Sequence, residues 1–153
     1  MTVPAEKSVL ELLAQTFLRA ASVTTPVFDS VVLDAQQRHI RRKLLTCQSG
    51  GQFLVDFTKP AMLHQGDCLV LEDGRLVEIV AAVEDLMEVR GPHLARLAWH
   101  IGNRHLEAQI EPDRILLRRD PVIAHMLEHR GAAVRNVSET FEPEQGAYHS
   151  HDH

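Results

Sequence analysis

The chain has 153 residues, of which 44% are hydrophobic and 24% are charged. This composition is typical of a globular protein with one large domain or two small ones, and it excludes disordered and fibrous classes. Sixteen Lys and Arg against 21 Asp and Glu give a formal net charge of −5. We expect no nucleic-acid partner, because phosphate-backbone binders need a net basic face. No apolar run reaches the roughly 18 residues that cross a bilayer, so no membrane partner is expected.

The cysteines and the first residues indicate the compartment. Cys47 and Cys68 are too few for a disulfide scaffold and form no C-x-x-C pair. Cys68 lies in an expected strand, where a buried and unreactive thiol is the simplest interpretation, and nothing beside Cys47 indicates a lowered pKa. Residues 1–20 contain two Glu and one Arg, which fits neither a secretory signal nor a transit peptide. We therefore expect a cytoplasmic protein.

The first half of the chain is predicted to be rich in strands. A helix over residues 8–20 is expected to come first. Gly50-Gly51 and Asp73-Gly74 are hairpin dipeptides, in which glycine supplies a positive φ without steric cost, so the pattern predicts a small antiparallel β domain. The expected strands cover residues 31–33, 43–45, 52–57, 68–71 and 76–80.

After residue 80 the apolar spacing becomes helical. Four apolar residues recur at i, i+3, i+4 and i+7, namely Leu94, Leu97, Ala98 and Ile101. They predict an amphipathic helix that stops at Gly102. A second helix is predicted from Asp120 as N-cap, with Pro121 in its first turn, to Gly131 as C-cap.

Strand-like runs complete the second half. Residues 106–110 and 115–117 lie between the helices, and residues 133–137 follow the second one. The resulting order, β-α-β-β-α-β, is the ferredoxin-like arrangement, an antiparallel sheet with two helices on one face. The sequence thus predicts an α+β protein with three parts: a β-rich domain (1–74), a ferredoxin-like domain (75–139) and a mobile, His-containing tail (140–153).

Histidine is the unusual residue of this composition, with ten copies. His149, His151 and His153 alternate at the end of the chain, so in an extended segment their imidazoles share one face and can converge on one cation. Asp152 can add an oxygen ligand. Short His-rich tracts commonly bind metal, which favours metal binding here over a merely solvated terminus.

Five other histidines lie on or beside the two predicted helices. His93, His100 and His105 are interpreted on residue pattern alone as surface or hydrogen-bonded side chains. His125 and His129 have the i, i+4 spacing of a chelating pair. They are interpreted as surface residues, because no H-E-x-x-H sequence accompanies them.

Sequence motifs of catalysis are absent. The chain has no G-x-S-x-G, no phosphate-binding G-x-x-x-x-G-K-[ST] and no G-x-G-x-x-G. A metal-dependent hydrolase would need a placed carboxylate base beside an open metal position, and no sequence feature supports one. We expect that the protein is not an enzyme.

Two blocks of sequence resemble a known family. Residues 99–105 read Trp-His-Ile-Gly-Asn-Arg-His and are followed by Gln109-Ile110. The second block runs from Asp120 to Gly131-Ala132 and continues as Phe-Glu-Pro-Glu at 141–144. Both blocks resemble the urease accessory nickel chaperones of the UreE family.

The resemblance implies a non-enzymatic nickel metallochaperone that delivers Ni²⁺ for assembly of the urease active site. It implies a homodimer whose central ligand is His105, contributed by both subunits at the interface, with further ligands from His149, His151 and His153. His100 also lies in the motif and is a candidate ligand. The implied partners are the urease accessory GTPase and the complex of urease apoprotein with its accessory proteins. Residues 1–20 correspond to a variable extension, and the first half to a peptide-binding-type β domain.

One departure and one alternative stay open. Some relatives carry two more histidines where this chain has Arg119 and Pro121, so those auxiliary ligands are absent here. Imidazole sites that bind Ni²⁺ also bind Cu²⁺ and often Zn²⁺, so either ion can substitute. The alternative function is therefore a zinc- or copper-binding buffer or a metal-sensing protein.

Overall fold

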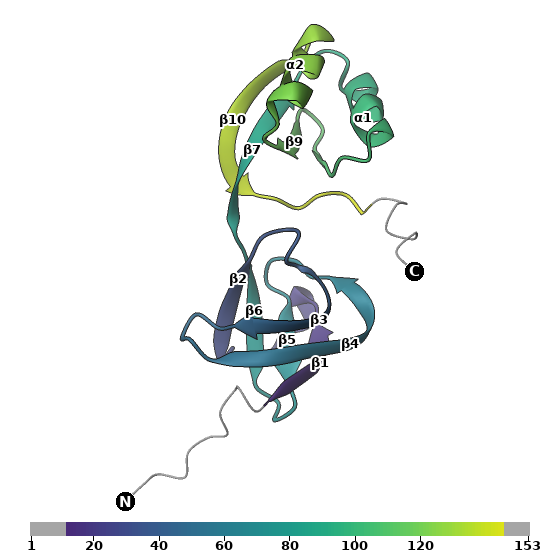
Figure 1. Ribbon diagram of the computed structural model, residues 1–153. Helices are drawn as coiled ribbons and strands as arrows, with labels where there is room; N and C mark the ends of the chain where they lie inside the picture. The colour runs from purple at the N-terminus through teal and green to yellow at the C-terminus, as the bar shows by residue number, and fades with distance from the viewer. Residues whose placement is uncertain (1–11, 146–153) are drawn as a thin grey trace, which may run out of the picture. The chain divides into compact units, whose positions relative to one another are not determined.

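The computed structural model describes residues 12–145. The chain divides into two compact units, Met1–Ala82 and Val83–His153, called here the N-terminal and C-terminal units. The described residues form a mixed α and β protein, mostly strands with two α-helices, which confirms the predicted class (Figure 1). None of the helices within 12–145 is long and apolar enough to span a membrane.

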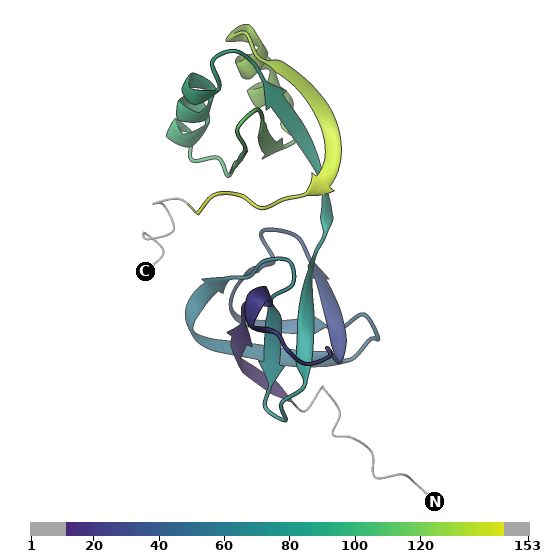
Figure 2. The same cartoon turned by 180° about the vertical axis from the view of Figure 1, so that it is seen from behind.

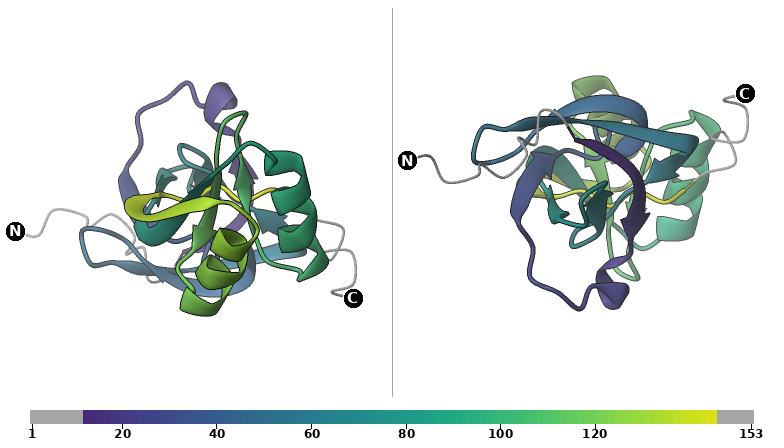
Figure 3. Two further views of the ribbon diagram at one scale, coloured as in Figure 1. Left: turned by 90° about the horizontal axis from the view of Figure 1, so that it is seen from above. Right: turned by 90° about the horizontal axis from the view of Figure 1, so that it is seen from below.

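The N-terminal unit is a curled six-stranded sheet (Figure 3, right) with the order β2-β6-β5-β1-β4-β3. Its core is built by alternation: Phe53, Val55 and Phe57 of β4 are buried, while the residues between them are partly exposed. A short 3-10 helix, Ala20–Ser22, follows β1. The strands are β1 (Leu13–Leu18), β2 (Asp29–Leu33), β3 (His39–Thr46), β4 (Gln52–Met62), β5 (Cys68–Leu71) and β6 (Leu76–Ala81).

Two predictions about this unit are corrected. The helix predicted over residues 8–20 is wrong for residues 13–18, which form β1, because a short apolar run fits either state and pairing with β4 and β5 decides it. The sheet is also not purely antiparallel. The two hairpins with glycine turns, β3–β4 and β5–β6, are antiparallel as predicted, but β1–β4 and β2–β6 are parallel. The parallel pairs join strands distant in sequence, which no turn motif reveals.

The division between the units falls after Ala82, whereas the predicted boundary at residue 74 lies in the turn between β5 and β6. β6 pairs with β5 on one side and with β2 on the other, so it belongs to the N-terminal sheet. The strand that begins the second unit is β7, directly after it.

The C-terminal unit has the element order β-α-β-β-α-β, but its first strand is β7, which was not among the predicted strands, whereas the expected first strand, residues 76–80, is β6 of the N-terminal sheet. Its four strands are antiparallel in the order β10-β7-β9-β8. Leu97, Ile101 and Leu127 of the two helices pack with alternate residues of β7 and β9 in one core, so both helices cover one face of the sheet (Figures 1 and 2). The elements are β7 (Val83–Arg90), α1 (Leu94–Asn103), β8 (Gln109–Ile110), β9 (Ile115–Arg118), α2 (Pro121–His129) and β10 (Ala133–Thr140).

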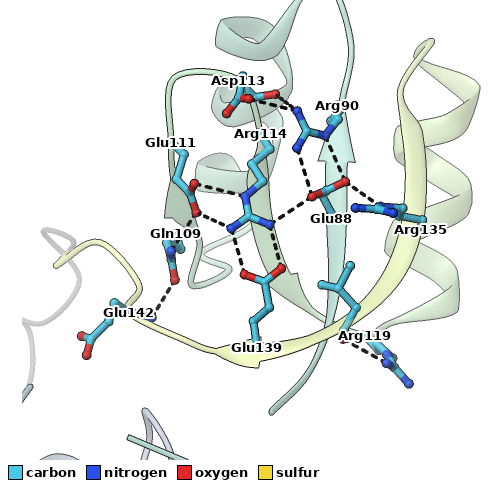
Figure 4. Close-up of polar contacts among 11 residues, drawn as sticks. Glu88, Arg90, Gln109, Glu111, Asp113, Arg114, Arg119, Arg135, Glu139 and Glu142 are labelled. Atoms are coloured by element: carbon cyan, nitrogen blue, oxygen red, sulfur yellow. Dashed lines mark hydrogen bonds and ion pairs between the residues drawn. The ribbon is translucent and has the colours of Figure 1, made fainter. Parts of the chain in front are cut away.

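An ionic network lies around Glu88 of β7, whose side chain is only 2% exposed (Figure 4). Its carboxylate accepts hydrogen bonds from Arg90, Arg135 and Arg114 at 2.8 to 3.0 Å. These bonds, that from Arg90 first, lower the pKa of Glu88 from 4.5 to about 2. Arg114 also binds Glu139 of β10 at 2.7 Å, so the network joins the strands through their side chains.

Candidate metal centre

The candidate site lies at the end of α1. Leu97 and Ile101 lie about one helical turn apart on α1, and both are buried. Their side of the helix therefore packs on the sheet. The helix continues through Gly102 to Asn103, so the stop predicted at Gly102 is early by one residue. The change of direction that ends the helix is made by the residues that follow.

A Schellman motif ends α1. The N–H of Leu106 donates to the carbonyl of Ile101 at 3.4 Å, and the N–H of His105 donates to the carbonyl of Gly102 at 3.0 Å. Leu106 packs against the core cluster that contains Ile101, in keeping with the apolar contact that often accompanies this motif. His105 therefore occupies the position just past the cap, which needs a left-handed backbone.

The backbone of His105 has φ +57, the only positive φ of a non-glycine residue among residues 12–145. α2 ends with the same pair of hydrogen bonds, but there the equivalent position is Gly131, with φ +91. A left-handed backbone costs a residue with a β-carbon about 1–2 kcal/mol, which glycine avoids. A strained, exposed residue where the fold favours glycine points to a role outside folding.

The surroundings of His105 are open. Its side chain is exposed and has no partner among the described residues. Six residues earlier, Trp99 is 63% exposed, and the centroids of its ring and of the His100 imidazole are 5.1 Å apart in an edge-on arrangement. Partial burial, and then the charges of Arg130 and Arg104, lower the pKa of His100. A neutral imidazole is the form that can ligate a metal.

The segment after β10 is anchored beside the His105 loop (Figure 2, yellow). Phe141 and Pro143 are buried. The N–H of Glu144 donates to the carbonyl of Ala108 at 2.8 Å, and the N–H of Glu142 donates to Oε1 of Gln109 at 2.8 Å. The Phe-Glu-Pro-Glu block of the sequence is therefore a structural junction that brings the end of the described chain to the loop after α1.

The structure separates the predicted ligands into two groups. His105 and His100 lie at one end of α1, whereas His149, His151 and His153 lie outside the described residues. Within 12–145, no three His, Cys, Asp or Glu side chains lie close enough together to hold one metal ion. The described part of one chain thus contributes donors without forming a complete site.

Arg119 and Pro121, the two departures from the family resemblance, have structural roles here. Arg119 donates to the carbonyls of Leu86 and Val137, both at 3.0 Å, and so ties the end of β9 to the middle of β7 and β10. Pro121 is the first residue of α2. The family resemblance identified these two positions, but it could not predict the structural roles of Arg119 and Pro121.

The remaining helical histidines were missed as a group. His93, at the N-cap of α1, and His100 of α1 line one groove with His125 and His129 of α2. The spacing of His125 and His129 identified them as a pair, but only the packing of α1 beside α2 brings all four together. The two cysteines are buried, as expected for Cys68, and burial raises the pKa of Cys47 to about 11.

Comparison with known proteins agrees with this two-unit architecture and places the chain in a class. The N-terminal domain of the UreE urease accessory protein matches residues 13–82, and its C-terminal domain matches residues 84–153. The urease accessory protein UreE of Rhizobium rhizogenes strain K84 is 50% identical over 138 residues, 88% of this chain and 83% of the relative. That of Brucella anthropi is 54% identical over 127 residues, 79% of this chain and 75% of the relative.

The chain belongs to the UreE family of urease accessory proteins. It is accordingly an accessory protein with a role in urease maturation and not an enzyme.

Proposed function

We propose that this protein is a nickel-binding metallochaperone that delivers Ni²⁺ for assembly of the urease active site. The observation that carries the proposal is His105, an exposed imidazole held in a left-handed backbone where the equivalent turn of α2 has glycine. The strain is maintained although glycine would relieve it, which is expected when the side chain has a task. Membership of a family that serves the maturation of a nickel enzyme supports Ni²⁺ as the cargo.

The proposed unit of function is a homodimer in which two His105 side chains face one ion. A two-fold interface brings the same residue of each chain to one point, so each protomer needs to contribute only part of the coordination. The exposed Trp99 ring, six residues before His105, supports an interface there, since large aromatic side chains are typical anchors of protein contacts. His100 is the second candidate ligand of this end of α1.

His149, His151 and His153 are proposed to supply further ligands. The anchor at Glu144 and Ala108 makes this geometrically feasible. His149 follows Glu144 by five residues, a reach of up to about 17 Å, whereas Ala108 lies three residues from His105, at most about 11 Å. Ligands on such a segment can leave again, which favours transfer of the ion over permanent storage.

The domain types that we propose agree with this role. The strand order β10-β7-β9-β8 supports a ferredoxin-like metal-binding domain in the C-terminal unit. A groove of about 540 Å³ beside Phe17 of β1 and Phe57 of β4 supports a peptide-binding-type N-terminal domain. The proposed receivers are the urease accessory GTPase and the complex of urease apoprotein with its accessory proteins, in the cytoplasm.

Imidazole ligands also accept Cu²⁺ and often Zn²⁺, so both ions are expected to compete for the site. This keeps a zinc- or copper-binding buffer or a metal sensor as the alternative function. Urease activation separates the two. The nickel chaperone predicts that urease produced with His105→Ala contains less nickel at limiting Ni²⁺, whereas a buffer predicts unchanged urease nickel.

The direct test is isothermal titration of the metal-free protein with Ni²⁺. His105→Ala is expected to abolish the tightest site while circular dichroism stays unchanged, because the side chain is exposed and contributes no packing. His129→Ala is the matched control, since it removes an exposed imidazole from the last residue of α2. A tight site that persists in folded His105→Ala, or that is lost equally in the control, would refute the assignment.

A further inference from the structure

A second candidate site lies between the helices of the C-terminal unit. A groove of about 580 Å³ separates α1 from α2, within the range of small-molecule sites. Leu97 and Met126 give it an apolar floor. The polar lining consists of His93, Arg96, His100, His125, His129 and Arg130. His105 is not among the lining residues, so the groove is a different site from the one centred on His105, although His100 borders both.

Helical spacing aims these side chains at one another. His93 is the N-cap residue just before α1, and Arg96 and His100 lie one turn apart on α1 itself, so that all three line the groove. His125 and His129 are one turn apart on α2, with ring centroids 6.5 Å apart and ring planes within 26°. The donors therefore come from two helices that the sheet holds in place.

The groove carries positive charge without compensation. No carboxylate lines it. The guanidinium groups of Arg96 and Arg130 have no hydrogen-bond or ion-pair partner among residues 12–145. In contrast, five other arginines of the C-terminal unit each bind an acidic side chain, namely Arg90, Arg114, Arg118, Arg119 and Arg135.

These features favour an anion over a metal ion. A cation would be repelled by two guanidinium groups, and no three metal-ligating side chains of the described residues converge. Guanidinium forks bind carboxylate and phosphate groups in a bidentate manner, and imidazole N–H groups add donors around them. We infer that the groove between α1 and α2 binds a small polyanion bearing carboxylate or phosphate groups, with Arg96 and Arg130 as its principal partners.

The test titrates metal-free, full-length protein with citrate and, separately, with inorganic phosphate, at about pH 7 and constant ionic strength. The two probes distinguish a polycarboxylate from a phosphate ligand. Calorimetry is expected to show saturable binding of at least one of the two anions. The changes in amide NMR chemical shift on binding should concentrate in residues 93–100 and 125–131. Removing one charged partner should weaken binding about tenfold or more, so Arg96→Gln and Arg130→Gln should both do so.

Two control variants keep the proposal falsifiable. Arg41→Gln removes an exposed positive charge from the N-terminal unit and should leave binding unchanged. His105→Gly should also retain anion binding, so that this proposal and the nickel centre can fail independently. Shifts spread over the whole surface, or equal losses in Arg41→Gln and Arg130→Gln, would reduce the effect to net charge and overturn the proposal. The proposal would also be overturned if neither anion bound, if His105→Gly still bound Ni²⁺, and if adding His125→Ala to that variant abolished the Ni²⁺ binding. The groove would then be a metal site. The NMR map of the wild type decides the matter even if a groove variant fails to fold.

Discussion

At the residue scale, His105 combines a conformation and an exposure that serve different purposes. The backbone satisfies the end of α1 through the Schellman hydrogen bonds, and the left-handed φ costs stability that Gly131 does not lose at the end of α2. The imidazole makes no contact that would offset this cost among the described residues. Folding and ligand binding can therefore be separated at this one position.

The first prediction is that His105→Gly is at least as stable as the wild type, with a free energy of unfolding higher by up to about 1 kcal/mol, while losing the tight Ni²⁺ site. His105→Val should be less stable than the wild type by about 1–2 kcal/mol, because a β-branched residue is poorly tolerated at positive φ. Urea unfolding of the three metal-free proteins measures the order. A glycine variant clearly less stable than His105 would mean that the left-handed turn is not the solution conformation.

The sequence motif identified His105 through family resemblance, but its conformation was not predictable from local pattern. The glycine rule favours Gly102 as the end of the helix, whereas Gly102 is helical and a histidine takes the left-handed position. Such a mismatch between residue type and backbone arises where function opposes local preference, and propensity reasoning fails there for that reason.

At the element scale, α2 illustrates what local sequence does determine. Asp120 was predicted as its N-cap, and Oδ1 of Asp120 accepts hydrogen bonds from the N–H groups of Val122 at 2.9 Å and Ile123 at 3.2 Å. Pro121 and Gly131 also lie where expected, in the first turn and just past the end. Caps act within one turn of the chain, so the sequence alone contains the necessary information.

The second prediction tests this cap. Asp120→Ala should lower the free energy of unfolding by about 1 kcal/mol, because it leaves two N–H groups of the first turn without their acceptor. His93→Ala is the matched control, since His93 precedes α1 at the same position but makes no capping hydrogen bond through its side chain. Urea unfolding should show the loss in the first variant only. Equal losses would contradict the capping role of Asp120.

Pairing between strands distant in sequence could not be predicted from local sequence. The β3–β4 and β5–β6 hairpins have glycine turns that the sequence displays, whereas the parallel β1–β4 and β2–β6 pairs depend on the path of the whole chain. The same reason explains the displaced domain boundary, because β6 is assigned to the first unit only by its pairing with β2. The local sequence pattern therefore predicted most of the elements, but it predicted fewer of the pairings between strands.

The third prediction concerns the network that ties β7 to its neighbours. The pKa of Glu88 is about 2 in the folded protein against 4.5 ordinarily, so its contribution to stability is complete above about pH 4.5 and is lost as the pH falls toward 2. Glu88→Gln should lower the free energy of unfolding by about 2–3 kcal/mol at neutral pH, since it removes charge-assisted hydrogen bonds from a buried group. The difference from the wild type should shrink as the pH approaches 2.

Asp113→Asn is the control for the network. Asp113 also pairs with Arg90, at 3.1 Å, but its side chain is 70% exposed, so the loss should stay below about 1 kcal/mol. Unfolding by urea at several pH values compares the two variants. A Glu88→Gln effect that is independent of pH would show that packing, not charge, dominates at this position.

At the scale of the whole molecule, every candidate ligand belongs to the C-terminal unit, and none of the described histidines forms a complete site alone. In the proposed dimer, one ligand comes from each protomer and others come from the end of the chain. A coordination shell assembled from separate pieces can be opened by removing one piece at a time. That property suits a carrier, which must hold the ion and then release it to another protein.

The last prediction assigns the share of the terminal histidines. Truncation after Gln145 should lower the stoichiometry or affinity of Ni²⁺ binding modestly, because a terminal segment gains ligand bonds only by losing conformational entropy. The His105 site should persist, since its ligand and its backbone turn lie within the folded unit. Equilibrium dialysis followed by metal analysis, together with calorimetry, measures both quantities.

A second variant with His149, His151 and His153 all replaced by alanine keeps the chain length and should match the truncation. If only the truncation reduces binding, backbone or carboxylate groups of the tail supply the ligands. If both variants bind as much Ni²⁺ as the wild type with equal affinity, the alternating histidines have no part in the site, and the dimer must complete the coordination of His105 from within the folded units.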